Sequence, residues 1–482
     1  YSSRYDYLWG YRQDYISSEI DQLFAGDRTT TNNDGTASET ARANFFGRVD
    51  YDYAGKYIVQ FNWRYDGSEN FPEGKRFGFF PGVSLGWRIS EESFWKDKIS
   101  WMDYLKIRAS FGKMGNDKVD AFQYMTTYTF QNPAVLGGSD PKLQTGVWQT
   151  RTANPNITWE VATTYNIGIE SRFLKHFNFE IDLFKTKRTN ILATRNASIP
   201  EYGGLTLPDE NIGECSSWGT EISLKFNKKI GDFRLNLGGN FTYATSRIDF
   251  IDEAEGVVDW QKRTGKPIGA DWVMYEAIGI FRTQADLDNY PHLSNAQLGD
   301  LIFKDTDESG TIDANDQVRL TKTPVPEIIY GINFSLSWKQ WSLTGLFQGA
   351  ARVWQYTFFE SGTIGNFTKD FYDDHWTENN INAKNPRVYD REATVTGQKN
   401  TFWLDDASYL RLKNIELAYE FSSRMLAKTP FTGLRLYMSG YNLLTFTKMK
   451  NLDPETAEGG QGFAAWSTPQ SKVFNFGVNI TF

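Results

Sequence analysis

Apolar and polar residues alternate at every second position, and this pattern recurs many times along the chain. Side chains of a β-strand point to alternate faces, so a period of two predicts strands with one apolar and one polar face. The pattern runs through 57–66, 177–185 and 233–243. It is clearest at the end of the chain, where the apolar face would hold Phe474, Phe476, Val478, Ile480 and Phe482.

The alternating segments are long enough to cross a lipid bilayer. A tilted transmembrane β-strand needs about 9–11 residues. At Lys413 and Asn414 the alternation slips by one residue, which predicts a β-bulge. Read in this way, the sequence predicts fourteen strands, roughly at 4–16, 42–53, 56–66, 79–90, 104–112, 159–173, 177–189, 217–228, 232–247, 328–338, 341–350, 408–421, 432–444 and 472–482.

The connections between these strands alternate between long and short. Outer-membrane barrels have short periplasmic turns and long extracellular loops. We therefore predict an all-β protein, a transmembrane antiparallel β-barrel whose last residue, Phe482, lies on the periplasmic side. The long connections are 17–41, 67–78, 113–158, 190–216, 248–327, 351–407 and 445–471. The short ones are 54–55, 91–103, 174–176, 229–231, 339–340 and 422–431.

The composition supports a barrel and excludes other classes. The chain has 36 Phe, 25 Tyr and 16 Trp among 482 residues, yet its mean hydropathy is only −0.52. No segment approaches 18 consecutive apolar residues, so we expect no transmembrane helix. A net charge of −8 without a basic stripe argues against a nucleic-acid partner. Aromatics beside short turns, such as Tyr51, Tyr53 and Trp338, suit a membrane-interface girdle or hairpin packing in a soluble sheet.

The sequence holds no constellation for catalysis, so we expect no enzyme. The three histidines, His176, His292 and His375, have no partner at metal-ligand spacing. No phosphate-binding loop, nucleophile elbow or paired-cysteine motif is present. The single cysteine, Cys215, cannot form an internal disulfide.

One acidic segment has the spacing of a calcium-binding loop. Oxygen-bearing residues stand at loop positions 1, 3, 5, 7, 9 and 12, with glycine at position 6 for the sharp turn. Position 12 is aspartate rather than glutamate, which shortens its reach. Two readings stay open, a Ca²⁺ site and an Asx-rich turn without metal. The candidate ligands are Asp305, Asp307, Ser309, Thr311, Asp313 and Asp316, with Gly310 between them.

The long connections are rich in aromatic residues. Such side chains could grip a substrate or a covering lid protein, or pack the loops against one another. We expect contacts with a lid and substrate from 113–158, 248–327 and 351–407, because long loops without regular structure are usually functional. The candidate contact residues are Trp148, Trp260, Trp272, Trp354, Tyr356, Trp376, Trp403 and Trp466.

Several motifs, in order, resemble the SusC-like (RagA-type) TonB-dependent transporters. The resemblance covers nearly the whole chain and depends on the number and order of the motifs. They are DGSENFPEGKRFGFFPGVSLGWRISEESF at 66–94, LKIRASFGKMGN at 105–116, NPNITWEVATTYNIGIE at 154–170, GDLIFKDTDESGTIDANDQ at 299–317, PEIIYGINFSLSWKQWSLTGLFQGA at 326–350, SYLRLKNIELAYEF at 408–421, LRLYMSGYNLLTFTKMKNLDPE at 434–455 and the final KVFNFGVNITF.

The resemblance implies a 22-stranded barrel in the outer membrane of a Gram-negative bacterium. Residues 1–482 would be its C-terminal part, holding the last fourteen strands. An N-terminal plug, a TonB-contacting segment and the first strands would lie outside this chain, whose two end strands would then have unpaired edges in lipid. The implied function is import of a glycan or oligopeptide with a SusD-like surface lipoprotein. Alternatives are a passive 14-stranded porin-type channel and a soluble all-β carbohydrate-binding protein.

Overall fold

The fold was obtained as a computed structural model and is dominated by one large antiparallel sheet. The structure describes residues 2–15, 17, 19–20, 22–96, 98–130, 134–138, 141–195, 208–358, 368–388, 395, 397–456 and 468–482. Among these residues, no helix has both the length and the apolar character needed to cross a membrane.

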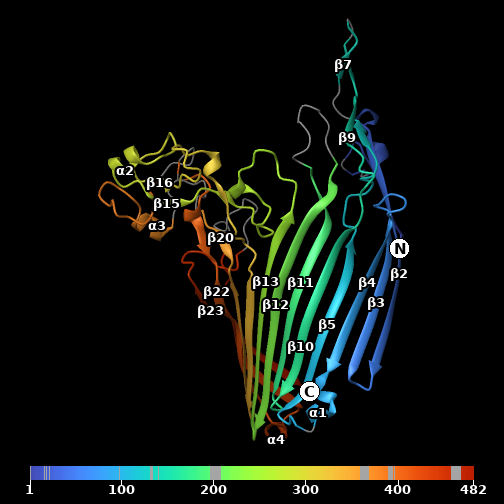
Figure 1. The fold of residues 1–482 in the computed structure, drawn as a ribbon, viewed down its shortest axis with the longest axis vertical. Helices are drawn as coiled ribbons and strands as arrows, with labels where there is room; N and C mark the ends of the chain where they lie inside the picture. Colours follow the sequence, from blue (N-terminus) through green and yellow to red (C-terminus); the bar gives the residue numbers. More distant parts are fainter. Residues whose placement is uncertain are drawn as a thin grey trace.

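The large sheet has 14 strands that follow one another in chain order. It contains each of the fourteen predicted strands, and Figure 1 shows them side by side as a curved wall. The strands are β1 (Ser2–Tyr11), β2 (Asn32–Tyr53), β3 (Tyr57–Ser68), β4 (Phe77–Arg88), β5 (Met102–Asn116), β10 (Glu160–Phe173), β11 (Phe177–Ala193), β12 (Glu210–Ile230), β13 (Phe233–Phe250), β18 (Ile328–Trp338), β19 (Trp341–Ala351), β22 (Tyr409–Glu420), β23 (Gly433–Thr447) and β24 (Val473–Thr481).

The predicted sorting of the connections is confirmed. Short turns and the small helices α1 (Ser93–Lys96) and α4 (Ser423–Leu426) lie at one end of the wall, together with the C-terminus (Figure 1). The long connections gather at the other end. We refer to these as the short-turn end and the long-loop end.

Three strand boundaries differ from the predictions by five residues or more. β1 ends at Tyr11 rather than at residue 16. β2 begins at Asn32 and β12 at Glu210, seven to ten residues before the predicted starts at 42 and 217. These extensions continue the hydrogen-bonded ladder with mostly polar residues. Because the backbone pairing continues where the apolar alternation has stopped, the period-two signal could not reveal them.

The first strand also differs in position. β1 pairs only with Asn32–Ala41 of β2, whereas β2 pairs with β3 through Arg42–Tyr53. β1 therefore lies toward the long-loop end rather than beside the rest of the wall. Its alternating aromatics produced the same sequence pattern as a membrane strand. Among the described residues, β1 and β24 are not paired with each other, so the sheet is open.

The two faces of the wall have the character that the alternation predicts. On β24, Phe476 is 78% exposed, and Phe474, Val478 and Ile480 share its outward face. The predicted bulge is confirmed, because Leu412 and Asn414 pair with both neighbouring strands while Lys413 is skipped.

The polar face carries an ion pair that spans three strands. Arg108 of β5 and Asp182 of β11 both lie opposite Gly168 of β10, and their Nη2 and Oδ2 atoms are 2.6 Å apart. A Cβ atom at position 168 would come within 2.6 Å of Asp182 Oδ1. Glycine leaves the space through which the two side chains meet, and a larger residue here would have to push them aside.

Candidate functional site: the loop unit and its acidic loop

Two long connections fold together at the long-loop end. The described residues of 251–327 and 352–408, here called the loop unit, contain three small sheets. These are β14 (Val273–Met274) with β17 (Val318–Arg319), β15 (Ala277–Ile280) with β16 (Leu301–Phe303), and β20 (Trp354–Tyr356) with β21 (Leu404–Asp406). The loop unit also contains the helices α2 (Gln284–Asn289) and α3 (Lys369–Asp373). In Figure 1 this unit projects beyond the wall at its long-loop end. These long connections therefore contain regular structure of their own.

Apolar side chains from both segments pack into two shared cores, and this packing explains why the loops fold. The first core joins Trp272 and Met274 to Phe371 and Trp403. The second core consists of Tyr275, Ile280, Leu301, Phe303, Ile312, Trp376, Ala383 and Val395. Each segment alone would expose half of these side chains, so burial of apolar surface requires the two segments to assemble.

Polar contacts hold the two segments in register. The Tyr275 N–H donates to the Lys399 carbonyl at 3.0 Å, and the Thr401 N–H donates to the Tyr275 carbonyl at 3.0 Å. The fully buried Asp300 carboxylate lies 2.6 Å from Arg387 Nε. Losing Arg387 would remove a cation that compensates the buried Asp300 charge.

Four of the seven predicted contact aromatics that the structure describes are buried inside the loop unit. Trp272, Trp376, Trp403 and Tyr356 are each less than 10% exposed, so their rings contact other loop residues. Trp354 and Trp260 are partly buried. Burial raises the pKa of the Tyr356 hydroxyl above its ordinary range.

Trp148 has a different environment. It lies on β9 (Val147–Arg151), in a hairpin that stands apart from the loop unit at the long-loop end (Figure 1), and is 53% exposed. Among the predicted contact tryptophans that the structure describes, it is the most accessible to a partner. The remaining candidate, Trp466, lies outside the described residues.

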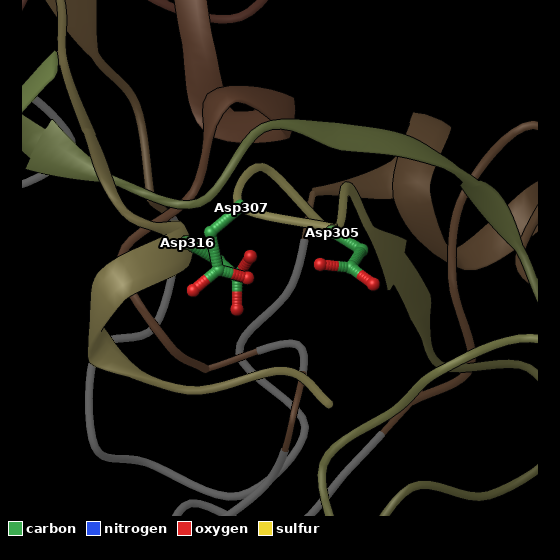
Figure 2. Close-up of side chains that lie close together, drawn as sticks. All are labelled: Asp305, Asp307 and Asp316. Carbon is green, nitrogen blue, oxygen red and sulfur yellow. The ribbon is translucent and has the colours of Figure 1, made fainter. Parts of the chain in front are cut away.

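The acidic loop brings three of its predicted ligands together. Asp305, Asp307 and Asp316 each offer a carboxylate oxygen, and these three oxygens lie within 4.8 Å of one another. Figure 2 shows the three side chains converging from two sides of the loop. The loop follows strand β16 (Leu301–Phe303), so its N-terminal flank is extended rather than helical.

Backbone geometry curls the loop around these carboxylates. Glu308 and Gly310 adopt left-handed φ values of 57° and 82°, which produce the tight turn. Asp305 accepts hydrogen bonds from the Ser309 and Gly310 N–H groups at 3.1 and 2.9 Å. Hydrogen bonding from Ser309 holds the pKa of Asp307 below its ordinary value.

The remaining candidate ligands have other contacts. Asp313 caps the short helix η6 (Ala314–Asp316) by accepting from the Asn315 N–H at 2.7 Å. The Thr311 carbonyl accepts from the Ser309 hydroxyl at 3.0 Å. Fully buried Asp316 accepts from the Thr306 and Asp313 N–H groups at 2.6 and 2.8 Å.

The donor set fits a hard divalent cation. Ca²⁺ prefers several oxygen ligands, and three clustered carboxylates supply both oxygens and the compensating charge. Each carboxylate oxygen that accepts one N–H retains a second lone pair. Asp305, Asp307 and Asp316 could therefore hold a calcium ion without first breaking the hydrogen bonds that shape the loop.

Sequence reasoning missed the residues that anchor this loop. Ile312 sits in the second core of the loop unit and is 6% exposed. Trp260 Nε1 donates to the Asn315 carbonyl at 2.7 Å, and Gln261 donates to the carbonyls of Ala314 and Gln317 at 2.7 and 2.9 Å. The only sequence signal was Ile312, a lone apolar residue within an acidic run.

A second polar cluster fastens another loop to the wall. Arg411 of β22, whose side chain is 2% exposed, lies 2.6 Å from Asp453 and 2.5 Å from Glu455. Glu455 also lies 3.0 Å from Lys413 Nζ and accepts from the Tyr409 hydroxyl at 2.9 Å. The β23–β24 connection is thereby tied down onto the wall. The sequence could not pair residues more than forty positions apart.

Comparison with known proteins identifies the class of this fold. The family model described as "TonB dependent receptor-like, beta-barrel" matches residues 1–443. The chain therefore belongs to this family of receptor barrels, which lie in the outer membrane of Gram-negative bacteria.

The chain is also similar to two curated relatives. TonB-dependent receptor P3 of Formosa agariphila is 29% identical over 97% of this chain and 48% of the relative. TonB-dependent receptor SusC of Bacteroides thetaiotaomicron is 27% identical over 92% of this chain and 44% of the relative. The chain thus spans about half the length of the curated relatives it matches.

A solved structure shares the fold. The structure of the RagAB peptide transporter superposes with a TM-score of 0.75 at 23% identity, covering 100% of this chain and 52% of the matched chain. The fold class inferred from the alternation is confirmed by this match and by the family model.

Proposed function

We propose that this chain forms part of the barrel of an active nutrient importer in the outer membrane. The observation that carries this proposal is the match of residues 1–443 to the TonB-dependent receptor barrel family. The similarity to SusC and to the RagAB peptide transporter supports a glycan or an oligopeptide as the cargo.

The proposed importer needs further parts. We propose that a plug and additional strands complete the barrel, because the described edges of β1 and β24 remain unpaired and open sheet edges are costly in lipid. TonB would act through the plug, and a SusD-like lipoprotein would cover the long-loop end. The family resemblance and the size difference from the curated relatives support this arrangement.

A passive 14-stranded channel is the second candidate, since the sheet has that number of strands. Uptake measurements distinguish the two. Active import predicts that removing TonB, or collapsing the proton gradient, abolishes uptake into cells that express the whole receptor. A passive channel would continue to equilibrate the same solute. Uptake that persists without TonB and without the gradient would therefore refute the proposed function.

We also propose that loop 305–316 binds one calcium ion and that the ion stabilises the loop unit. The convergence of Asp305, Asp307 and Asp316 supports this proposal. Extracellular sites of about 10⁻⁴–10⁻³ M are typical of such modules. The ion would have a structural role, because no group with a catalytic arrangement lies beside it among the described residues.

A luminescent calcium substitute tests the site. Trp260 donates to Asn315 within the loop, so its indole can transfer excitation to bound Tb³⁺. We expect saturable Tb³⁺ luminescence that Ca²⁺ displaces. Asp305→Asn should weaken binding, whereas Asp288→Asn on α2 should not. An unchanged signal in Asp305→Asn would contradict the proposal.

A further inference from the structure

A cleft lies at the rim of the long-loop end, between the loop unit and the β23–β24 connection. Its volume is about 520 Å³, within the range of about 300–1,000 Å³ that small-ligand sites usually have. One wall is α3 and the residues that follow it, and the other wall is 448–452. We call this feature the rim cleft. No candidate ligand or metal residue of the sequence analysis except Trp403 contributes to its lining.

The two walls carry opposite charges. Three carboxylates, those of Asp370, Asp373 and Asp374, line the α3 wall together with one lysine, Lys384. Lys448 and Lys450 line the facing wall, and Asp405 is the remaining charged residue of the lining. Among the described residues, no ion pair joins one wall to the other. The walls therefore present an acidic side and a basic side to whatever enters.

Most of these charges are engaged within their own wall. Asp373 pairs with Lys369, and the Asp374 carboxylate lies 4.0 Å from Lys384. On the facing side, Lys448 Nζ lies 3.1 Å from Asp406. Within the described part of the chain, this leaves Asp370 and Lys450 without an ion-pair partner, one on each wall. Both side chains are exposed.

The walls have fixed positions. Phe371 of α3 is 3% exposed and stacks on Trp403, with ring centroids 5.7 Å apart. The opposite wall is held by Met449, which is buried against Tyr409 and Val353, and by the Arg411–Asp453 ion pair that follows. Charges on fixed supports can bind a ligand without first paying the entropy of ordering the loops.

We propose that the rim cleft binds a small zwitterion that has an ammonium group at one end and a carboxylate at the other, such as a short peptide with free termini. The ammonium group pairs with Asp370, and the carboxylate pairs with Lys450. A neutral glycan gains nothing from this separation of charge. The inference rests on the proposed import function and names the cargo chemistry that this rim selects.

Binding to the receptor extracted in detergent, together with any subunit that stays bound, tests the inference. The probes are tri-alanine with free termini, its N-acetylated and C-amidated forms, and maltotriose, each measured by titration calorimetry. We expect tri-alanine to bind most tightly and each blocked form to lose about two- to fivefold in affinity, the size expected of one exposed ion pair.

Two single variants assign each end of the ligand. Asp370→Asn should weaken tri-alanine by about two- to fivefold but leave the N-acetylated form unchanged, because that form has no ammonium group to lose. Lys450→Gln should behave in the same way toward the C-amidated form. Lys428→Gln, an exposed lysine beside α4 at the short-turn end, is the matched control and should bind like the wild type.

Three outcomes would overturn the inference: maltotriose binding as tightly as tri-alanine, tri-alanine binding the variants and the wild type equally, or no probe binding at all. Different results would count against the import proposal. If tri-alanine binds the cleft as expected but TonB has no effect on uptake, the import proposal fails and the cleft stands. If uptake depends on TonB but the variants bind normally, the cleft proposal alone fails.

Discussion

The wall and the loop unit belong to one chain but are stabilised by different physics. On the wall, Phe476 is 78% exposed and faces lipid, so backbone pairing between strands holds the structure. In the loop unit, Phe303 is 3% exposed and stacks on Tyr275 with ring centroids 4.7 Å apart. The loop unit therefore folds like a small water-soluble domain, through the burial of apolar side chains.

The largest expected effect comes from a cavity in the loop unit. Phe303→Ala should destabilise the loop unit by about 3–5 kcal/mol, because the lost ring leaves a void in a packed core. Phe476→Ala is the matched control on the wall, where lipid can fill the space. Protease cleavage of the loop unit measures the first effect, and heat-modifiable gel mobility measures the wall. Equal loss of wall stability in both variants would show that the two regions do not unfold separately.

A charge on the lipid face should damage the wall and spare the loop unit. Ile167 lies midway along β10 and is 58% exposed on the outward face. Ile167→Arg should cost about 2–4 kcal/mol, the value for arginine at the bilayer midplane. Asn166→Arg, on the polar face of the same strand, should cost much less. Unfolding in urea from lipid vesicles gives both values, and similar losses for the two variants would contradict the assignment of faces.

Calcium removal should have the reverse selectivity. It should destabilise the loop unit and leave the wall unchanged. At a calcium concentration ten times the dissociation constant, one site stabilises the folded state by about 1.4 kcal/mol. Chelation should therefore speed proteolysis of the loop unit by roughly tenfold where cleavage follows local opening. Asp305→Asn should remove this dependence. If the chelator has no effect on the wild-type protein, the ion does not stabilise this region.

The smallest expected effect is a loss of stability at low pH in one turn of the wall, at the short-turn end. Glu92, at the short-turn end, accepts hydrogen bonds from the Tyr57 hydroxyl at 2.7 Å, Lys56 Nζ at 3.0 Å and the Trp87 indole at 3.2 Å. These hydrogen bonds, that from Tyr57 foremost, lower the pKa of Glu92 to about 2 from its ordinary value of 4.5.

Because the folded-state pKa is depressed, the stabilising contribution of Glu92 is present above about pH 4.5 and is lost as the pH falls toward 2. Hydrogen exchange of the 89–101 turn, measured between pH 5 and pH 3 and corrected for the intrinsic exchange rate, should show this loss. Glu92→Gln should lack it. A turn in the variant that still loosens with the wild-type profile would indicate that another group titrates.

The wall was predictable because its signal is local. The period-two alternation found all fourteen strands and the bulge at Lys413 without knowledge of their neighbours. The errors fall where that signal ends. The polar extension of β2 to Asn32 and the displacement of β1 follow from backbone pairing. This pairing does not depend on whether the side chains are polar or apolar.

The acidic loop was partly predictable for the same reason. Spacing alone brought Asp305, Asp307 and Asp316 into one candidate site, because a turn at Gly310 is also local. Spacing did not reveal that Trp260 and Gln261 hold the far side of the loop, since they lie more than fifty residues away in the chain.

The sequence by itself determined which residues face lipid, where the chain reverses and which end of the wall carries the long connections. These properties depend on the pattern within one strand or turn. Only the tertiary structure decided that 251–327 and 352–408 form one unit, that Trp272 and Trp376 are buried rather than presented to a ligand, and that Asp370 and Lys450 line one cleft. Each of these depends on contacts between distant segments. The burial of apolar surface that favours such contacts does not depend on how far apart the residues lie in the sequence.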